Sequence, residues 1–163
     1  MIVLNRDDLH DQAGMARAFS WYFEHVGDDP DCAGTFNTML APVYERCDFE
    51  KRTLVLSLQG KHWMANPGRM LHGGITASVL DLTMGLLCRY CSGGHMTPTI
   101  DMSVSFLKPA PFDRKLYIEA EVTRLGFNIC HAVSRMWAEG AEDTPLATAA
   151  ASYYVTHHME TDG

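Results

Sequence analysis

The order of sequence patterns predicts an α+β fold in which a long central helix is wrapped by a curved antiparallel sheet. The longest apolar stretch runs from Gly73 to Tyr90, is rich in Leu, Met and Ala, and is too long for a typical strand. Four strand-like segments follow it, joined by short turns, which is typical of an antiparallel sheet. Because a helix that is apolar all round must be covered on most sides, we expect the sheet to curve around it.

An extra helix is expected before this core, over residues 8–26. Apolar residues recur there at spacings of three and four and form one stripe: Leu9, Ala13, Ala16, Phe19 and Phe23. Asp7 and Asp8 suit the start of this helix, and Gly27 suits its end.

Two strands are expected before the long helix and four after it. The mixed segment Phe36 to Glu45 is interpreted as the first strand, and Thr53 to Gln59 alternates like a half-buried strand. The long helix ends near Gly93-Gly94, and the apolar period then changes to two. The four later strands are predicted at these segments: Ile100 to Phe106, Leu116 to Val122, Ile129 to Ala138 and Leu146 to Val155.

Composition limits the classes of protein to which the chain belongs. A length of 163 residues suits one domain, and 47% hydrophobic with 20% charged residues is ordinary for a globular protein. The net charge of −7, with no basic run, argues against a nucleic-acid partner. No segment reaches the ~18 consecutive apolar residues that indicate a membrane span, and the N-terminus has no signal-peptide pattern. We therefore expect neither a nucleic-acid nor a membrane partner.

The cysteines indicate a reducing compartment rather than a disulfide framework. Their number, five, is odd, and a domain of this size folds without covalent cross-links, so a cytoplasmic location is expected. Cys88 and Cys91 have redox or zinc spacing, but no second pair follows, and they are interpreted as core residues. The adjacent pair His157-His158 lies in a tail that is expected to fray, so no metal site is predicted.

One charged residue, Asp81, lies between His72 and Arg89 in the predicted buried helix. An ionised carboxylate in apolar surroundings is unfavourable unless it is paired or hydrogen-bonded, and no cation lies three or four residues away. Two interpretations remain: Asp81 is a functional acid, or it makes a structural polar contact, with Thr99 or Ser78 as the expected partner.

Two glycines, Gly73 and Gly74, begin the same helix directly after His72. Glycine is unfavourable in a helix, but it lets a ligand approach the free N–H groups at the positive end of the helix dipole. The alternative is a tight turn that needs glycine for its dihedral angles. His72 by itself either caps the helix or lies on the surface.

The spacing of Gly73 and Asp81 predicts a site shared by two chains. Eight residues of helix span about 12 Å, so one substrate carbonyl cannot contact both groups of the same helix. If both act, they come from two antiparallel copies of the helix, and the dimer is obligatory for activity.

These residues resemble the signature of a known family. The stretch Asn66 to Gly74, followed by Asp81, resembles the motif of the PaaI-type hot-dog acyl-CoA thioesterases, and so do the strand Thr99 to Ala110 and the final strand, Ala147 to Tyr154. The resemblance covers roughly residues 40–156. It implies the hot-dog fold, an acyl-CoA substrate, no cofactor, and a homodimer or a dimer of dimers.

The resemblance also implies a role for each matching residue. Asp81 would be the general base or nucleophile, and Gly73 would donate its N–H to the thioester oxygen from the other subunit. Asn66 would orient the substrate or the attacking water, His72 would support that loop, and Thr99 would help to hold the water.

Further residues are expected to bind the substrate. Gly74 would contribute at the helix start, and the acyl pocket between the two helices and the sheet would be walled by Leu80, Met84 and Leu87. The phosphates of CoA would contact three candidate cations: Lys108, Arg114 and Arg124. The chain departs from its relatives at Phe127, where they often carry a basic residue.

The expected organisation is a helical extension over residues 1–35, a thioesterase domain over 36–157 and a frayed tail over 158–163. The N-terminal helix either covers the pocket mouth or packs on the sheet. Two rival functions are a hot-dog hydratase or dehydratase, whose usual His-Phe-x-Gly and Asp-x-Asn-x-x-His motifs are absent here, and a non-catalytic acyl-CoA binding protein.

Overall fold

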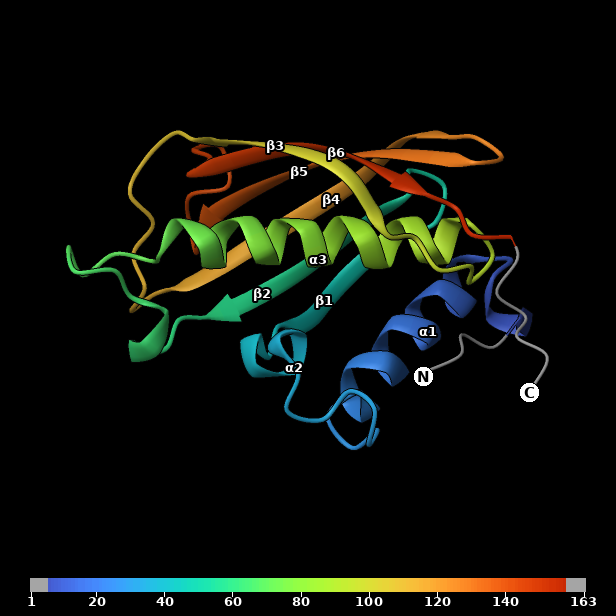
Figure 1. The fold of residues 1–163 in the computed structure, drawn as a ribbon, viewed down its shortest axis with the longest axis horizontal. Coiled ribbons are helices and arrows are strands. Elements are labelled where there is room, and N and C mark those ends of the chain that lie inside the picture. The colour runs from blue at the N-terminus through green and yellow to red at the C-terminus, as the bar shows by residue number, and fades with distance from the viewer. Residues whose placement is uncertain (1–5, 158–163) are drawn as a thin grey trace.

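The long apolar stretch forms helix α3, Gly73–Cys91, and a six-stranded sheet curves over it (Figure 1). The computed structural model describes residues 6–157. Ser92 follows the helix, and Gly93 and Gly94 then take positive φ angles, which glycine adopts without strain and which end the helix where the sequence predicted. The predicted α+β architecture is confirmed.

All neighbouring strands of the sheet are antiparallel. Their order is β1 (Val43–Asp48), β2 (Thr53–Gln59), β4 (Lys115–Leu125), β5 (Ile129–Ala138), β6 (Ala147–Tyr154) and β3 (Thr99–Phe106). Side chains that alternate along β2, β4, β5 and β6 pack with one side of α3 in a single core. Strand β2, which lies next to the edge strand β1, is buried on both faces rather than half-buried, because Val55 and Ser57 are covered almost as fully as Leu54, Leu56 and Leu58.

The N-terminal helix α1, Gln12–His25, follows a short 3-10 turn, Arg6–Asp8. Its cap is Asp11, whose carboxylate accepts a hydrogen bond from the Gly14 N–H at 2.7 Å, and not the predicted Asp7 or Asp8. The buried stripe is also displaced by about one residue from the predicted one, since Met15, Ala18 and Phe19 are buried and Ala13 is exposed. Figure 1 shows α1 on the β1 side of α3.

The first half of the predicted first strand is instead a short helix, α2, Phe36–Leu40. Local polar contacts stabilise it, because the Thr38 hydroxyl donates to the carbonyl oxygens of Cys32 and Thr35. Ala41, with φ of 49°, then ends the helix in the left-handed region, and the strand begins only at Val43.

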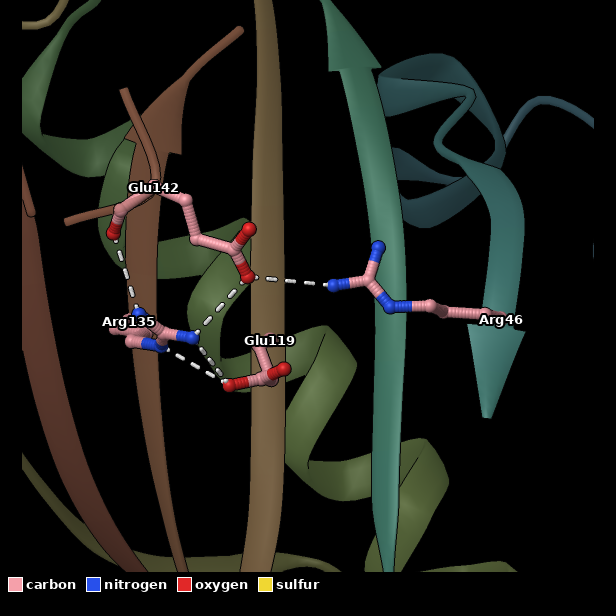
Figure 2. A network of polar contacts seen from close by, with 4 residues as sticks. All are labelled: Arg46, Glu119, Arg135 and Glu142. Carbon is pink, nitrogen blue, oxygen red and sulfur yellow. Dashed lines mark hydrogen bonds and ion pairs between the residues drawn. The ribbon is translucent and has the colours of Figure 1, made fainter. Parts of the chain in front are cut away.

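The face of the sheet away from α3 carries a network of charged residues (Figure 2). Arg135 on β5 contacts Glu119 on β4 at 2.9 Å and Glu142 in the following turn at 3.5 Å. Arg46 on β1 contacts the same Glu142 oxygen at 3.5 Å. The network links residues of three strands on a solvated face and so marks the side of the sheet that does not hold the core.

The cysteines are free thiols. Cys88 is fully buried, 3.0 Å from the Cys130 sulfur, while Cys91 is half-buried and burial raises the pKa of its thiol to about 12. These environments agree with core residues rather than with an exposed reactive pair.

Candidate active site

Asp81 lies midway along α3, half-buried, where the helix faces strands β3 and β6. Its Oδ1 atom accepts two hydrogen bonds of 2.9 Å, one from the Thr99 hydroxyl and one from the Tyr153 hydroxyl. The Tyr153 hydroxyl also lies 3.2 Å from the Asp81 carbonyl oxygen. The carboxylate is therefore held by both neighbouring strands, and the expected contact with Thr99 is present.

Tyr153 was not singled out from the sequence. Thr99 and Tyr153 are register partners in the β3–β6 pair, so their hydroxyls reach the same side of the sheet. Gly85, one turn beyond Asp81, lies next to the ring, since a Cβ there would be in van der Waals contact with a Tyr153 ring carbon at 3.4 Å. The period of two along β6, in which Ala149 and Ala151 are also buried, was the signal that places Tyr153 inward.

Tyr153 is a hydrogen-bond donor at neutral pH. Burial raises the pKa of its hydroxyl far above the ordinary value of 10.0, and the charge of Asp81 raises it further. The hydroxyl therefore keeps its proton and donates a hydrogen bond to the carboxylate.

The second carboxylate oxygen of Asp81 is left for a ligand. Both donors converge on Oδ1, and within residues 6–157 no hydrogen bond to Oδ2 is formed. Asp81, Thr99 and Tyr153 all line a cavity of about 230 Å³ beside α3. Asp81 is therefore a carboxylate that is held through one oxygen and that lines a cavity.

The start of α3 presents a second polar group. His72 caps the helix: its Nδ1 atom accepts from the Gly74 N–H at 2.9 Å, and its carbonyl oxygen accepts from the Thr76 N–H at 3.1 Å. The Gly74 N–H is thus occupied, whereas the Gly73 N–H has no partner in the described part of the chain. Gly73 is consequently the glycine that can donate to a substrate oxygen.

The tight-turn explanation for the two glycines does not hold. Neither Gly73 nor Gly74 has a positive φ. A Cβ at Gly73 would lie 3.5 Å from the Phe106 ring, which is an ordinary van der Waals distance. Neither the backbone conformation nor crowding by other residues of the chain requires glycine at position 73. This favours the interpretation that glycine lets a ligand approach the backbone there.

Asn66 holds the loop before α3 in its observed form. Its Oδ1 atom accepts from the Met70 N–H at 3.1 Å, and its backbone N–H donates to the Met70 carbonyl at 2.8 Å. The loop is tied to the domain where the Leu71 N–H donates to the Ala110 carbonyl and the His72 N–H donates to the Met64 carbonyl. Asn66 and Gly73 thus lie at one end of α3, and Asp81 lies two turns away.

Leu80, Met84 and Leu87 are fully buried in the core of the single chain. They do not line the cavity at Asp81, to which α3 contributes Leu82, Gly85, Leu86 and Arg89 besides Asp81 itself. Their predicted place in the wall of an acyl pocket between two helices stays a prediction.

The candidate cations for CoA are dispersed. Lys108 and Arg124 are exposed, whereas the Arg114 guanidinium donates to the Glu139 carbonyl at 2.8 Å. Lys108 lies near the start of α3, where Ala110 is bonded to Leu71, and Arg124 lies at the other end, where Leu125 shares a cavity with Cys91. Within one chain, the candidate cations therefore do not lie together at one site.

Residues 6–157 contain neither a cluster of metal-binding side chains nor a membrane-spanning helix. No group of three or more His, Cys, Asp or Glu side chains is placed to hold a metal ion there. In the same range no helix is long and apolar enough to cross a membrane. His158 lies outside the described residues.

Several solved structures with the same architecture are described as thioesterases. The zebra fish thioesterase superfamily member 2 aligns with a TM-score of 0.74 at 19% identity, covering 86% of this chain and 97% of that one. A putative thioesterase from Ralstonia eutropha, described as a phenylacetic acid degradation-related protein, aligns with a TM-score of 0.69 at 25% identity over 82% and 99% of the two chains. A hypothetical thioesterase from Streptococcus pneumoniae, solved with coenzyme A, aligns with a TM-score of 0.63 at 22% identity over 71% and 88%. These likenesses define the hot-dog fold.

The sequence around Asp81 is similar to known thioesterases. The model of the thioesterase superfamily matches residues 68–144, which include Gly73, Asp81 and Thr99. The bovine acyl-coenzyme A thioesterase THEM4 is 32% identical over 76 residues, which are 47% of this chain and 30% of that protein. The chain thus spans less than a third of that curated relative. The resemblance to hot-dog thioesterases is confirmed, and the matched family is one of thioester hydrolases.

Proposed function

We propose that the protein hydrolyses acyl-CoA thioesters with Asp81 as the catalytic carboxylate. The observation that carries this proposal is the environment of Asp81, which lines a cavity and is held through Oδ1 by the hydroxyls of Thr99 and Tyr153. The similarity to a bovine acyl-CoA thioesterase and to a structure that contains coenzyme A supports the substrate class.

The chemistry needs one base and one oxyanion donor. Asp81 Oδ2 takes a proton from water, whose oxygen attacks the thioester carbonyl carbon, or it attacks that carbon directly. The carbonyl oxygen becomes negative and is stabilised by the Gly73 N–H at the positive end of α3. The C–S bond then breaks, and the CoA thiolate leaves and takes up a proton. In the direct route the acyl group is now joined to Asp81 as a mixed anhydride, which water hydrolyses to the free acid and the original carboxylate.

The positioning residues divide between the two ends of the site. Thr99 and Tyr153 orient the carboxylate through Oδ1, and Thr99 would also help to hold the attacking water. His72 caps α3 and so orients the Gly73 N–H, while Asn66 holds the preceding loop and would orient the substrate or the water.

A dimer is part of the proposal because Gly73 and Asp81 are eight residues apart on one helix, about 12 Å along its axis. Strand β3 is a sheet edge, and Ile100 and Phe106 on it are more than half exposed. An exposed edge with apolar side chains favours pairing with another chain. Antiparallel pairing of two β3 strands would bring Asp81 of one chain toward Gly73 of the other, and Lys108 and Arg124 would then be available from different subunits to hold CoA.

The test is thiol release from a panel of acyl-CoAs by wild type, Asp81→Asn and the control Asp143→Asn, which changes an exposed carboxylate in a turn. We expect Asp81→Asn to lose turnover by at least about a thousandfold while CoA still binds, because the amide neither accepts the proton nor attacks. Asp143→Asn should retain full activity. Wild type that binds acyl-CoA without releasing thiol would instead make the protein a binding module and Asp81 a structural acid.

A further inference from the structure

Two cavities adjoin on the α1 side of α3. The first, of about 230 Å³, contains Asp81 and Thr99 in its wall. The second, of about 290 Å³, lies between α1, α2 and the start of β1. Three residues line both cavities, namely Tyr22 from α1, Asn37 from α2 and Leu82 from α3, so the two spaces meet at these side chains.

The second cavity differs from the first in its chemistry. Its lining includes Phe23, Val26, Pro42 and Val43, together with the shared Leu82, and it contains no charged residue. The first cavity contains Asp81 and Arg89. A path from the carboxylate into the second cavity thus runs from polar to apolar surroundings, which suits a molecule with a reactive polar end and an apolar tail.

We propose that the second cavity binds the distal part of the acyl chain, so that helices α1 and α2 determine acyl-chain preference. The proposal rests on the proposed function, because it places the thioester carbon at Asp81. From there the chain passes Leu82, the next residue of α3, and enters the second cavity between Tyr22 and Asn37.

The size of the two cavities points to medium-chain acyl groups. Together they reach the lower end of the range of about 300–1,000 Å³ that is typical of small-molecule sites. An acetyl group would leave the apolar cavity unused, whereas a long-chain acyl group would exceed it. Hexanoyl and octanoyl groups are the substituents that we expect to be preferred.

Asn37 offers a direct test, since it lies at the junction and is exposed, so a larger side chain there does not disturb the core. Asn37→Trp should close the passage. Met39→Trp is the matched control, because Met39 is 50% exposed on the same short helix and lines neither cavity. Val43→Lys, at a residue that is 58% exposed, independently places a charge in the second cavity.

The measurement is the dissociation constant of octyl-CoA and ethyl-CoA thioethers, which cannot be hydrolysed. Each buried methylene contributes about fourfold in affinity, so wild type and Met39→Trp should bind the octyl compound at least about tenfold more tightly. In Asn37→Trp and Val43→Lys this ratio should fall toward one with ethyl-CoA affinity retained.

An octyl preference that persists in both variants, or a wild type without any octyl preference, overturns the inference. Either result leaves the proposed hydrolysis intact, because thiol release and the Asp81→Asn variant test it separately. Thioether binding as expected, with no thiol release from any acyl-CoA, would support the acyl cavity and refute only the catalytic step.

Discussion

At the scale of single residues, the carboxylate of Asp81 was identifiable from the sequence because it is the one charge inside a long apolar helix. Its chemical role depends on which oxygen is occupied, and that follows from two hydroxyls on neighbouring strands, Thr99 and Tyr153. Since both bind Oδ1, the orientation of the free Oδ2 depends on both. Each hydroxyl is therefore expected to affect turnover rather than CoA affinity.

Removing the Tyr153 hydroxyl tests this dependence. Tyr153→Phe should lower kcat by about 10- to 100-fold, because a hydrogen bond to a charged group is worth roughly 1.5–3 kcal/mol, with KM almost unchanged.

The matched control is Tyr154→Phe, which removes the hydroxyl of the adjacent tyrosine, 45% exposed and on the other face of β6. It should leave both kcat and KM unchanged. An unchanged kcat in Tyr153→Phe would show that the Tyr153 hydroxyl does not orient the carboxylate.

At the scale of elements, the beginning of α3 has one backbone N–H, that of Gly73, without a hydrogen-bond partner among residues 6–157. His72 occupies the Gly74 N–H, and its φ of −62° and ψ of 137° are angles that a residue before proline adopts readily. Gly73 is the first residue of the helix, which is the position where proline is best tolerated. A proline at position 73 can therefore remove this N–H without breaking the helix.

Gly73→Pro removes the N–H and should lower kcat by about 100- to 1,000-fold, the usual effect of losing an oxyanion donor. Gly73→Ala keeps the N–H, and its Cβ meets the Phe106 ring at only 3.5 Å, so it should fold normally and lose much less activity. Kinetics of both variants, with thermal unfolding to confirm that each is folded, provide the measurement. Equal losses in the two variants would remove Gly73 from the oxyanion role.

Most elements were predictable because their apolar periods are strong. The period of two predicted the four later strands, and the long apolar run predicted α3. The segment Phe36–Leu40 was predicted wrongly as strand because five residues carry little periodicity, and the hydroxyl contacts of Thr38 that stabilise the helix depend on how the chain turns at Cys32. The displaced stripe of α1 has a similar origin, since β1 decides which side of the helix is covered.

At the scale of the whole molecule, the two polar groups of the site are too far apart on α3 to serve one substrate within one chain. The open edge of β3 offers the surface through which a second copy would supply the missing group. Activity is therefore expected to require two chains even though each chain folds around its own core.

Mixing two inactive variants tests the shared site. Asp81→Asn and Gly73→Pro chains, unfolded together and refolded at equal concentration, should recover about a quarter of wild-type activity, because half of the random dimers are mixed and each has one intact site. Each variant refolded alone is the control and should stay inactive. Recovery of no activity in the mixture, with mixed dimers demonstrated by mass spectrometry, would place the whole site within one chain.

The sequence by itself predicted the architecture, the resemblance to the thioesterase family and the candidate site residues Asp81, Gly73, His72 and Thr99, because periodicity, a lone charge in an apolar helix and a helix-start motif are local patterns. The tertiary structure decided which oxygen of Asp81 is free, brought Tyr153 to it, occupied the Gly74 N–H, moved Leu80 and Met84 to the core and opened the apolar cavity beneath α1 and α2. These features depend on contacts between residues far apart in the chain, such as the 72 positions between Asp81 and Tyr153, and no local pattern contains them.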